Sequence, residues 1–437
     1  MRYAAHPTWP FGGSCVTSLY ALRYLAQRLR YLLNTNFLIR LLRIIHSTWR
    51  WLLLGVAGLL AGPPLTQAQG TQVPVEVRVP LAPQPVLGSD GLLHIAYELH
   101  VTNYYQSTGT LRLRQVTVLA DDTPLVLAHF TGPALSRLLA HPATGPDTAA
   151  VPIEAGKRVV LFLWLTLPAH RPRPRWVRHQ LAFTTPSGAR QVVDGVRTVF
   201  NDAVPIVVGA PLRAGPWLAY AGPGNAQAHH WNGVVVVNGQ TTIPQRYAAD
   251  FYGLTPAGYA LRRPVAFEQL STTAHPDWVG FGAEVLAVAD GIVRDARDGE
   301  PNRPPMGPQP VLTDLTERTL MGNFVVLEVA PGVFAHYAHL QPGSLLVKVG
   351  DRVRRGAVLG CLGQSGQAPL PHLHFQISNA VTFEESEGLP FVLQRFERLG
   401  SATLGDALTP AQVPVIHGAP AACQHQLPLD GDVLLFK

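Results

Sequence analysis

Two histidines in the stretch PHLHF are separated by one residue, a spacing that suits a shared chemical role. On a β-strand, His372 and His374 would lie on the same face, because successive side chains point to opposite faces. Leu373, Phe375 and Ile377 would then form the opposite, apolar face. The polar face is either solvated or lines a site, and the two histidines alone do not decide between these possibilities.

Two further segments supply residue types that a zinc hydrolase needs. Such an enzyme uses three protein ligands from His, Asp or Glu and keeps an open position for water. It also needs neighbouring groups that move protons and stabilise the oxyanion formed at the scissile carbonyl. Asp250 in QRYAADF and His339 in YAHL join His372 and His374 as candidates for these tasks, and all four lie on candidate strands.

The elements that must position these residues are expected to be strands. GAEVLAVADGIVRDARDG is typical of two strands around a tight Asp290-Gly291 turn. GNFVVLEVAPGVFAHYAHL predicts a second hairpin that turns at Pro331-Gly332, and VKVGDRVRRGAVLGCLGQSG repeats the pattern. We therefore expect residues 217–390 to form a mostly β domain.

The ordered blocks GAEVLAVADGIV, GNFVVLEV, YAHLQPGSLLVKVGDRVRRGAVLGCLGQSG and PHLHFQI resemble the lysostaphin-like (LytM-like) zinc metallopeptidases, which cut peptide bonds in bacterial cell walls. The resemblance covers residues 217–390 and implies a lysostaphin-like β-domain with the duplicated hybrid motif. It implies that Asp250 and His374 ligate zinc. It also implies that His339 and His372 position or deprotonate the attacking water and hydrogen-bond the developing oxyanion.

The first metal-binding motif of that family, His-x-x-x-Asp, is altered in this chain. Arg246 stands where the motif that ends at Asp250 calls for histidine. Arginine has no free lone pair and stays protonated, so it cannot replace a zinc ligand. Its guanidinium would repel a metal, and it could pair with Asp250 and compete for the carboxylate.

Several answers to the missing ligand stay open. His229 or His230 in NAQAHHWNG could reach the metal, and so could His275 in the long insert after Phe251. Otherwise the site is weak or incomplete, and the domain recognises the cell wall without cutting it. The resemblance, together with the signal-like leader, implies an exported zinc metalloendopeptidase that hydrolyses peptidoglycan peptides. The alternative is a catalytically inactive cell-wall-binding scaffold or regulator.

Residues 70–205 are expected to form a second β domain. LLHIAYELHVTN alternates apolar and polar side chains, and RVVLFLWLTL is apolar on both faces, as in a central strand. Short strands between turn signals are typical of an immunoglobulin-like β-sandwich. We interpret His94 and His100, on the polar face of the first strand, as solvated residues. Residues 391–437 are treated as a C-terminal tail that predicts no function.

The positive charge of the chain lies in its first residues. The chain has 437 residues and a formal net charge of +6, but residues 1–50 hold seven arginines and no acidic residue. The remaining 27 basic residues face 28 acidic ones, so the composition excludes an electrostatic surface for nucleic acid. Residues 1–68 combine those arginines, the apolar run WLLLGVAGLLAG and small residues before a cut after Ala68, the pattern of a secretory signal peptide. We expect a periplasmic or extracellular protein that contacts a membrane only through an uncleaved leader.

The composition agrees with a mainly β, globular protein. The chain holds 40 glycines and 39 prolines, and only 14% of its residues are charged, which favours loops and strands over a coiled coil or a disordered tail. Beyond the leader it has two cysteines, Cys361 and Cys423. They could form one disulfide or remain two buried thiols.

Overall fold

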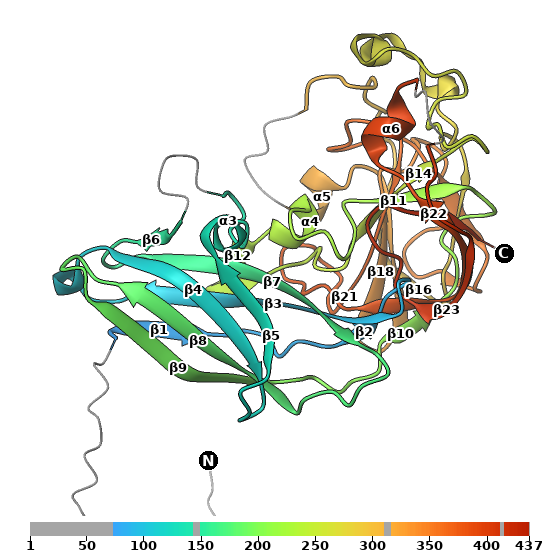
Figure 1. The fold of residues 1–437 in the computed structure, drawn as a ribbon. Helices are drawn as coiled ribbons and strands as arrows, with labels where there is room; N and C mark the ends of the chain where they lie inside the picture. Colours follow the sequence, from blue (N-terminus) through green and yellow to red (C-terminus); the bar gives the residue numbers. More distant parts are fainter. Residues whose placement is uncertain (1–72, 143–148, 310–315, 411–414, 437) are drawn as a thin grey trace, which may run out of the picture. The chain divides into compact units, whose positions relative to one another are not determined.

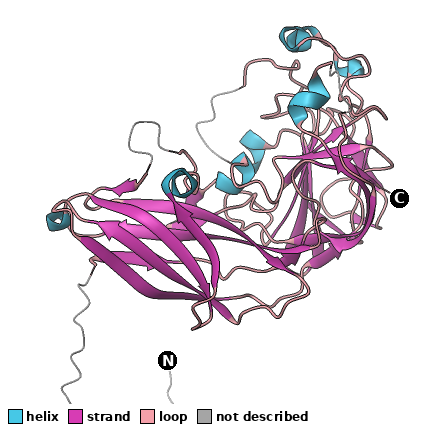
Figure 2. Ribbon diagram, in the orientation of Figure 1, coloured by secondary structure: helices cyan, strands magenta, loops and turns pink. Residues whose placement is uncertain are grey.

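The structure is a computed structural model that describes residues 73–142, 149–309, 316–410 and 415–436. This part of the chain is mainly β, as predicted, and its helices are short (Figure 2). The expected signal peptide, residues 1–68, lies outside the described residues. Among the helices of the described ranges, none has the length and apolar character needed to cross a membrane.

The N-terminal part consists of two antiparallel sheets. In the first sheet, β3 (Leu92–Asn103) pairs with β1 (Val75–Arg78), β2 (Val86–Leu87) and β7 (Arg158–Pro168). The second sheet contains β4 (Leu111–Ala120), β5 (Val126–Thr131), β6 (Val151–Ile153), β8 (Trp176–Thr184) and β9 (Arg190–Val199). Side chains of both sheets, Tyr97 and Phe183 among them, share one buried apolar cluster. This packing is that of a β-sandwich, and the sandwich is defined here as strands β1 to β9.

The polar face of β3 is buried, so the interpretation of His94 and His100 as solvated residues is wrong. His94 accepts a hydrogen bond from Nε1 of Trp164 at 2.8 Å, and Glu98 pairs with Arg246 of the C-terminal part. Alternation along the strand predicted which residues share a face, but it could not reveal that other side chains cover that face.

The C-terminal part is built around a large sheet (Figure 1). Its order is β10-β22-β24-β11-β14-β21-β18-β17-β16-β19, with β23 beside β22. The strands are β10 (Ile206–Val208), β11 (Trp217–Tyr220), β14 (Ala249–Gly253), β16 (Gly291–Arg297), β17 (Phe324–Ala330), β18 (Val333–Ala338), β19 (Arg352–Val353), β21 (Leu373–Ser378), β22 (Phe391–Ser401), β23 (Ala421–Gln426) and β24 (Asp432–Leu435). The segment treated as a tail therefore contributes β22, β23 and β24 to the sheet that carries the candidate residues.

Short elements complete the described part. Two small sheets pair β12 (Val235–Val237) with β13 (Gln240–Thr242), and β15 (Glu284–Leu286) with β20 (Val358–Cys361). The helices are η2 (Gln106–Thr108), α3 (Gly132–Ser136), α4 (His229–Asn232), η3 (Phe267–Thr272), η4 (His275–Asp277), α5 (Glu317–Leu320) and α6 (Leu404–Leu408). Cys361 and Cys423 are free thiols.

Of the three segments predicted to form hairpins, one is confirmed and two are wrong. Strands β17 and β18 pair antiparallel, and Gly332 at their turn has φ +71°, a value that favours glycine. The turn at Asp290-Gly291 does not close a hairpin, because β15 pairs with β20 while β16 pairs with β17 and β19. Asp290 instead accepts a hydrogen bond from the backbone N–H of Arg355 at 2.8 Å, so this turn joins two different sheets. The third segment, VKVGDRVRRGAVLGCLGQSG, contributes β19, which pairs with β16, and β20, which pairs with β15.

Candidate metal centre

Three neighbouring strands of the large sheet, β14, β21 and β18, position the candidate residues. Asp250 of β14 lies opposite His374 of β21, and Ala338 of β18 lies opposite His374 on the other side. Directly opposite residues of an antiparallel pair share a face, so Asp250 and His374 point to the same side. His339 directly follows β18, and His372 directly precedes β21. The sheet thus brings together the four residues predicted from the sequence.

One carboxylate oxygen lies at the centre of the cluster. Oδ1 of Asp250 is 3.1 Å from Nδ1 of His374 and 3.4 Å from Nε2 of His372. Nε2 of His230 lies 3.5 Å from the same oxygen. The ring centre of His339 is 4.7 Å from that of His372 and 6.0 Å from that of His374. All five side chains are at most 5% exposed, which removes the cluster from bulk water.

In each of the four imidazoles, a hydrogen bond holds one of the two ring nitrogens. Three rings donate from Nδ1 to a backbone carbonyl oxygen: His230 to Ala221 at 2.9 Å, His339 to Ser365 at 2.9 Å and His372 to Leu370 at 2.7 Å. His374 donates from Nε2 to Oε1 of Gln376 at 2.9 Å. Because a carbonyl oxygen can only accept, these bonds fix which nitrogen of each neutral ring carries the proton.

The fixed tautomers make the cluster a fitting site for a divalent metal. In the neutral rings of His230, His372 and His374, the nitrogen near Asp250 carries a lone pair, and these lone pairs converge beside its carboxylate. Acceptors that face one another in a buried space need a cation or a proton between them. Imidazole and carboxylate ligands whose outer atoms are held by carbonyl or amide groups are the donor set of zinc sites.

The pKa values of the cluster residues also reflect the balance between burial and the charge of Asp250. Burial would raise the pKa of Asp250, but the neighbouring His372 and His230 hold that pKa well below its usual range. Burial would lower the pKa of His372, yet the Asp250 carboxylate beside it raises that pKa above its usual value. Burial lowers the pKa of His230 and His339 well below the usual range, which disfavours the protonated form of these two rings. The cluster therefore favours a positive charge next to Asp250.

Two of the three alternatives for the missing ligand reach the cluster. His229 and His230 lie on α4, and their ligating atoms and that of Asp250 all lie within 4.8 Å of one another. His230 is buried, whereas His229 is exposed. His275 does not join them, because its Nε2 donates to the carbonyl oxygen of Arg303 at 2.8 Å. Burial and the bond to Ala221 favour His230 over its neighbour.

Arg246 does not compete for Asp250, which corrects the expectation from the sequence. Its side chain is 2% exposed and donates two hydrogen bonds to Glu98, at 2.7 and 3.2 Å. Its Nε donates to Glu387 at 2.6 Å. Two buried carboxylates therefore bind the guanidinium, and Asp250 stays available to the histidines.

Two residues of the site were not assigned a role from the sequence. Gln376 shares the polar face of β21 with His374, and this alternation was the signal that could have identified it as the partner of that ring. Tyr252 lies two residues beyond Asp250 on β14, and its ring stacks on His372 with centres 5.0 Å apart. Alternation along β14 places Tyr252 on the face of Asp250 in the same way.

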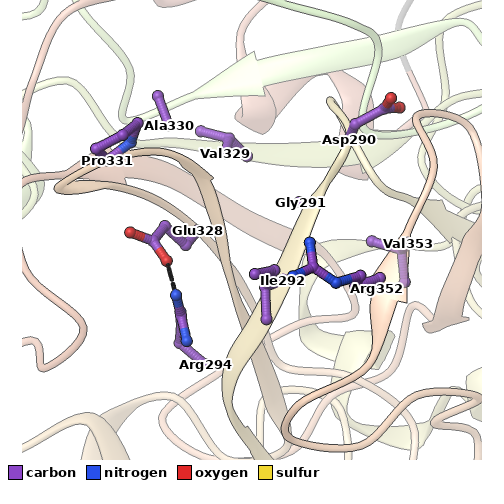
Figure 3. A pocket seen from close by; sticks show the side chains of 10 residues that line it. All are labelled: Asp290, Gly291, Ile292, Arg294, Glu328, Val329, Ala330, Pro331, Arg352 and Val353. Carbon is purple, nitrogen blue, oxygen red and sulfur yellow. Dashed lines mark hydrogen bonds and ion pairs between the residues drawn. The ribbon is translucent and has the colours of Figure 1, made fainter.

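A surface pocket of about 550 Å³ lies apart from this cluster, at β16, β17 and β19 (Figure 3). Its charged residues include Arg294 and Glu328, which form an ion pair with each other, and Arg352. None of the residues lining this pocket belongs to the histidine cluster. The histidines and the carboxylate that could bind a metal therefore lie at the cluster and not at this pocket.

Comparison with known proteins places the cluster partly inside a family domain. Residues 278–385 match peptidase family M23. The matched range contains His339, His372 and His374, whereas Asp250 and α4 precede it. The altered first motif thus lies outside the matched range.

Curated relatives match short parts of the chain. Peptidoglycan DD-endopeptidase ShyC of Vibrio cholerae is 27% identical over 133 residues, 26% of each chain. Peptidoglycan DD-endopeptidase ShyA of the same species is 38% identical over 56 residues, 13% of each chain. The chain thus spans about a quarter of the length of the first of these relatives and less of the second. The solved catalytic domain of lysostaphin from Staphylococcus simulans is 20% identical, with 41% of this chain and 86% of that chain covered and a TM-score of 0.20. Residues 278–385 form a domain of peptidase family M23 within this chain.

Proposed function

We propose that this protein is an exported zinc metalloendopeptidase that hydrolyses peptide bonds of peptidoglycan. The observation that carries the proposal is the convergence of His230, His372 and His374 on one buried oxygen of Asp250. The names of the relatives support the substrate class, because both are peptidoglycan endopeptidases. The signal-like residues 1–68 support action outside the cytoplasm, in the periplasm or beyond the cell.

Asp250, His374 and His230 would hold the metal. Zinc in hydrolases takes three such ligands and leaves one position open. The bonds from His230 to Ala221 and from His374 to Gln376 orient the rings so that Nε2 and Nδ1, respectively, face Asp250. When bound, zinc supplies Lewis-acid polarisation of the scissile carbonyl and activation of the attacking water.

His339 and His372 would move protons and bind the oxyanion. The Nδ1–H of each ring is held by a backbone carbonyl, so Nε2 is the atom available to the substrate. A neutral ring accepts a proton from water at Nε2, and a protonated ring donates a hydrogen bond from Nε2 to the oxyanion and then a proton to the leaving amine. Stacking on Tyr252 restrains the plane of the His372 ring.

The alternative, an inactive cell-wall-binding scaffold or regulator, depended on Arg246 leaving the site without a third ligand. Because Arg246 pairs with Glu98 and Glu387, it does not occupy the Asp250 carboxylate. Because His230 lies beside Asp250, a third ligand is at hand. The contacts of the described residues therefore support the catalytic proposal over this alternative.

Replacing a proposed ligand histidine should abolish both zinc binding and cleavage, whereas replacing a proposed proton-transfer histidine should reduce cleavage alone. We expect the purified wild-type chain to carry about one zinc and to release peptides from purified peptidoglycan. His374→Ala should lose both the metal and the cleavage. His339→Ala should keep the metal while cleavage falls by ~10²–10⁴-fold, because it removes a proton-transfer group and no ligand. Elemental analysis and chromatography of released muropeptides measure the two properties. Cleavage that survives His374→Ala would refute the zinc mechanism.

Gln376→Leu should weaken zinc binding without removing a ligand. It deletes the acceptor that fixes the His374 tautomer, and the loss of such partners lowers metal affinity by ~10–100-fold. Titration against a chromophoric chelator measures the affinity. Gln424→Leu, an exposed glutamine on β23, is the matched control and should bind zinc like the wild type. Equal affinities for wild type and Gln376→Leu would contradict a role for this hydrogen bond.

A further inference from the structure

The residue next to the proposed third ligand packs against the sandwich. Trp231 follows His230 on α4 and is fully buried. Its ring meets Phe162 and Trp164 of β7 edge to face, with centres 5.4 and 5.6 Å apart. This arrangement is an attractive one for aromatic pairs. Side chains of β7, a sandwich strand, thus contact the neighbour of a candidate metal ligand.

The orientation of Trp164 is set by the sandwich itself. Its Nε1 donates to Nδ1 of His94 on β3 at 2.8 Å. The other nitrogen of His94 lies 3.1 Å from a carboxylate oxygen of Asp90. A chain of polar contacts within the first sheet therefore fixes the indole that Trp231 meets.

Arg246 contacts Trp231 from a second direction. Its guanidinium carbon lies 5.1 Å from the centre of the Trp231 ring, within the range of a cation–π contact. The guanidinium is bound in turn by Glu98 of β3 and by Glu387. The sandwich therefore reaches Trp231 twice, directly through β7 and indirectly through the carboxylate that binds Arg246.

The α4 turn depends on such packing for its position. It spans four residues, His229–Asn232, and has no side-chain hydrogen bond at its N-cap. A single helical turn is not stable by itself, so tertiary contacts must hold it. The contacts of Trp231 and the bond from His230 to Ala221 are such contacts.

We propose that the sandwich is a working part of the metal centre: Trp164 and Glu98 position Trp231, and Trp231 sets the place from which His230 reaches Asp250. This inference rests on the proposed zinc site. The arginine at the altered motif position and the histidine on α4 then belong to one arrangement. Arg246, at the motif position, thus helps to secure the segment that supplies His230.

Trp164→Ala in the full chain tests the inference, with Leu163→Ala as the matched control. Leu163 is the preceding residue of β7 and packs into the sandwich core, so its truncation weakens the sandwich without touching Trp231. Trp164→Ala should lower zinc affinity by at least ~10-fold. Its cobalt-substituted form should give the visible spectrum of His230→Ala. Trp164→Phe, which keeps an aromatic ring, should restore affinity and spectrum toward wild type, and Leu163→Ala should leave both unchanged.

Hydrogen exchange in the metal-free chain supplies a readout that needs no zinc. The amides of Asn232 and Gly233 donate within the α4 turn, to Ala228 and His230. Their exchange should be faster in Trp164→Ala than in wild type and in Leu163→Ala. Unchanged exchange in Trp164→Ala would overturn the inference, and so would an equal loss of zinc affinity in Leu163→Ala. A wild type without zinc would refute the proposed function, while the exchange comparison would still decide whether the sandwich positions α4.

Discussion

His230→Ala is expected to strip zinc from the purified chain and to lower peptidoglycan cleavage by at least ~100-fold. Removing a residue that only orients a ligand costs up to ~100-fold in metal affinity, so removing a ligand should cost no less. The loss would leave Asp250 and His374 as two ligands, fewer than the three of catalytic zinc sites. Elemental analysis of the full chain and chromatography of released muropeptides measure both effects.

His229→Ala is the control for this prediction. His229 is the exposed neighbour of His230 on the same helical turn, and the ring centres lie 4.0 Å apart. The two variants remove the same side chain from adjacent positions, so any difference between them reports the ligand and not the loss of a histidine. Zinc lost from His229→Ala and retained by His230→Ala would assign the third ligand to the exposed residue.

Arg246→His, which restores the family motif in the sequence, is expected to lower the free energy of unfolding by about 3–5 kcal/mol and to add no activity. Breaking a buried ion pair from one side leaves carboxylates without a counter-charge, which costs that amount. Glu98 and Glu387 are only 4% and 8% exposed. An imidazole is too short and has too few donors to replace three hydrogen bonds to two carboxylates. Urea unfolding of the full chain measures the loss.

An exposed arginine provides the comparison for this substitution. Arg213 donates to Glu284 at 2.6 Å, but their side chains are 60% and 50% exposed. Arg213→His should therefore change the free energy of unfolding by ~0–1 kcal/mol, as is usual for surface pairs. An Arg246→His variant that unfolds like the wild type and binds zinc more tightly would show that the motif histidine was the missing ligand after all.

The sequence predicted the parts of the site that depend on local patterns. Alternation predicted that His372 and His374 lie on one face, and the resemblance carried by the ordered motif blocks indicated that Asp250 and His339 join them. The choice of a third ligand stayed open between His229, His230 and His275, because it depends on where the α4 turn packs. No local pattern reveals that packing.

The partners of Arg246 were beyond the reach of the sequence for the same reason. Glu98 lies 148 residues away along the chain, and Glu387 lies 141 residues away. The contact with Glu98 exists only because the sandwich meets the C-terminal part, and the contact with Glu387 is made within the C-terminal part. The error about His94 and His100 has this cause too, since alternation shows which side chains share a face but not what covers it.

The strand order limits how this protein can be cut or recombined. Strand β11, which flanks β14 and hence Asp250, pairs on its other side with β24, a strand from the last residues of the chain. A fragment that ends with the family match at residue 385 would lose β22, β23 and β24 and would turn β11 into an open edge. Exposed edges of this kind recruit other chains and promote aggregation. The segment that matches the family is thus not a portable module: transfer between proteins would have to carry the C-terminal strands with it. The contacts of Glu98 and Trp164 argue for carrying the sandwich as well.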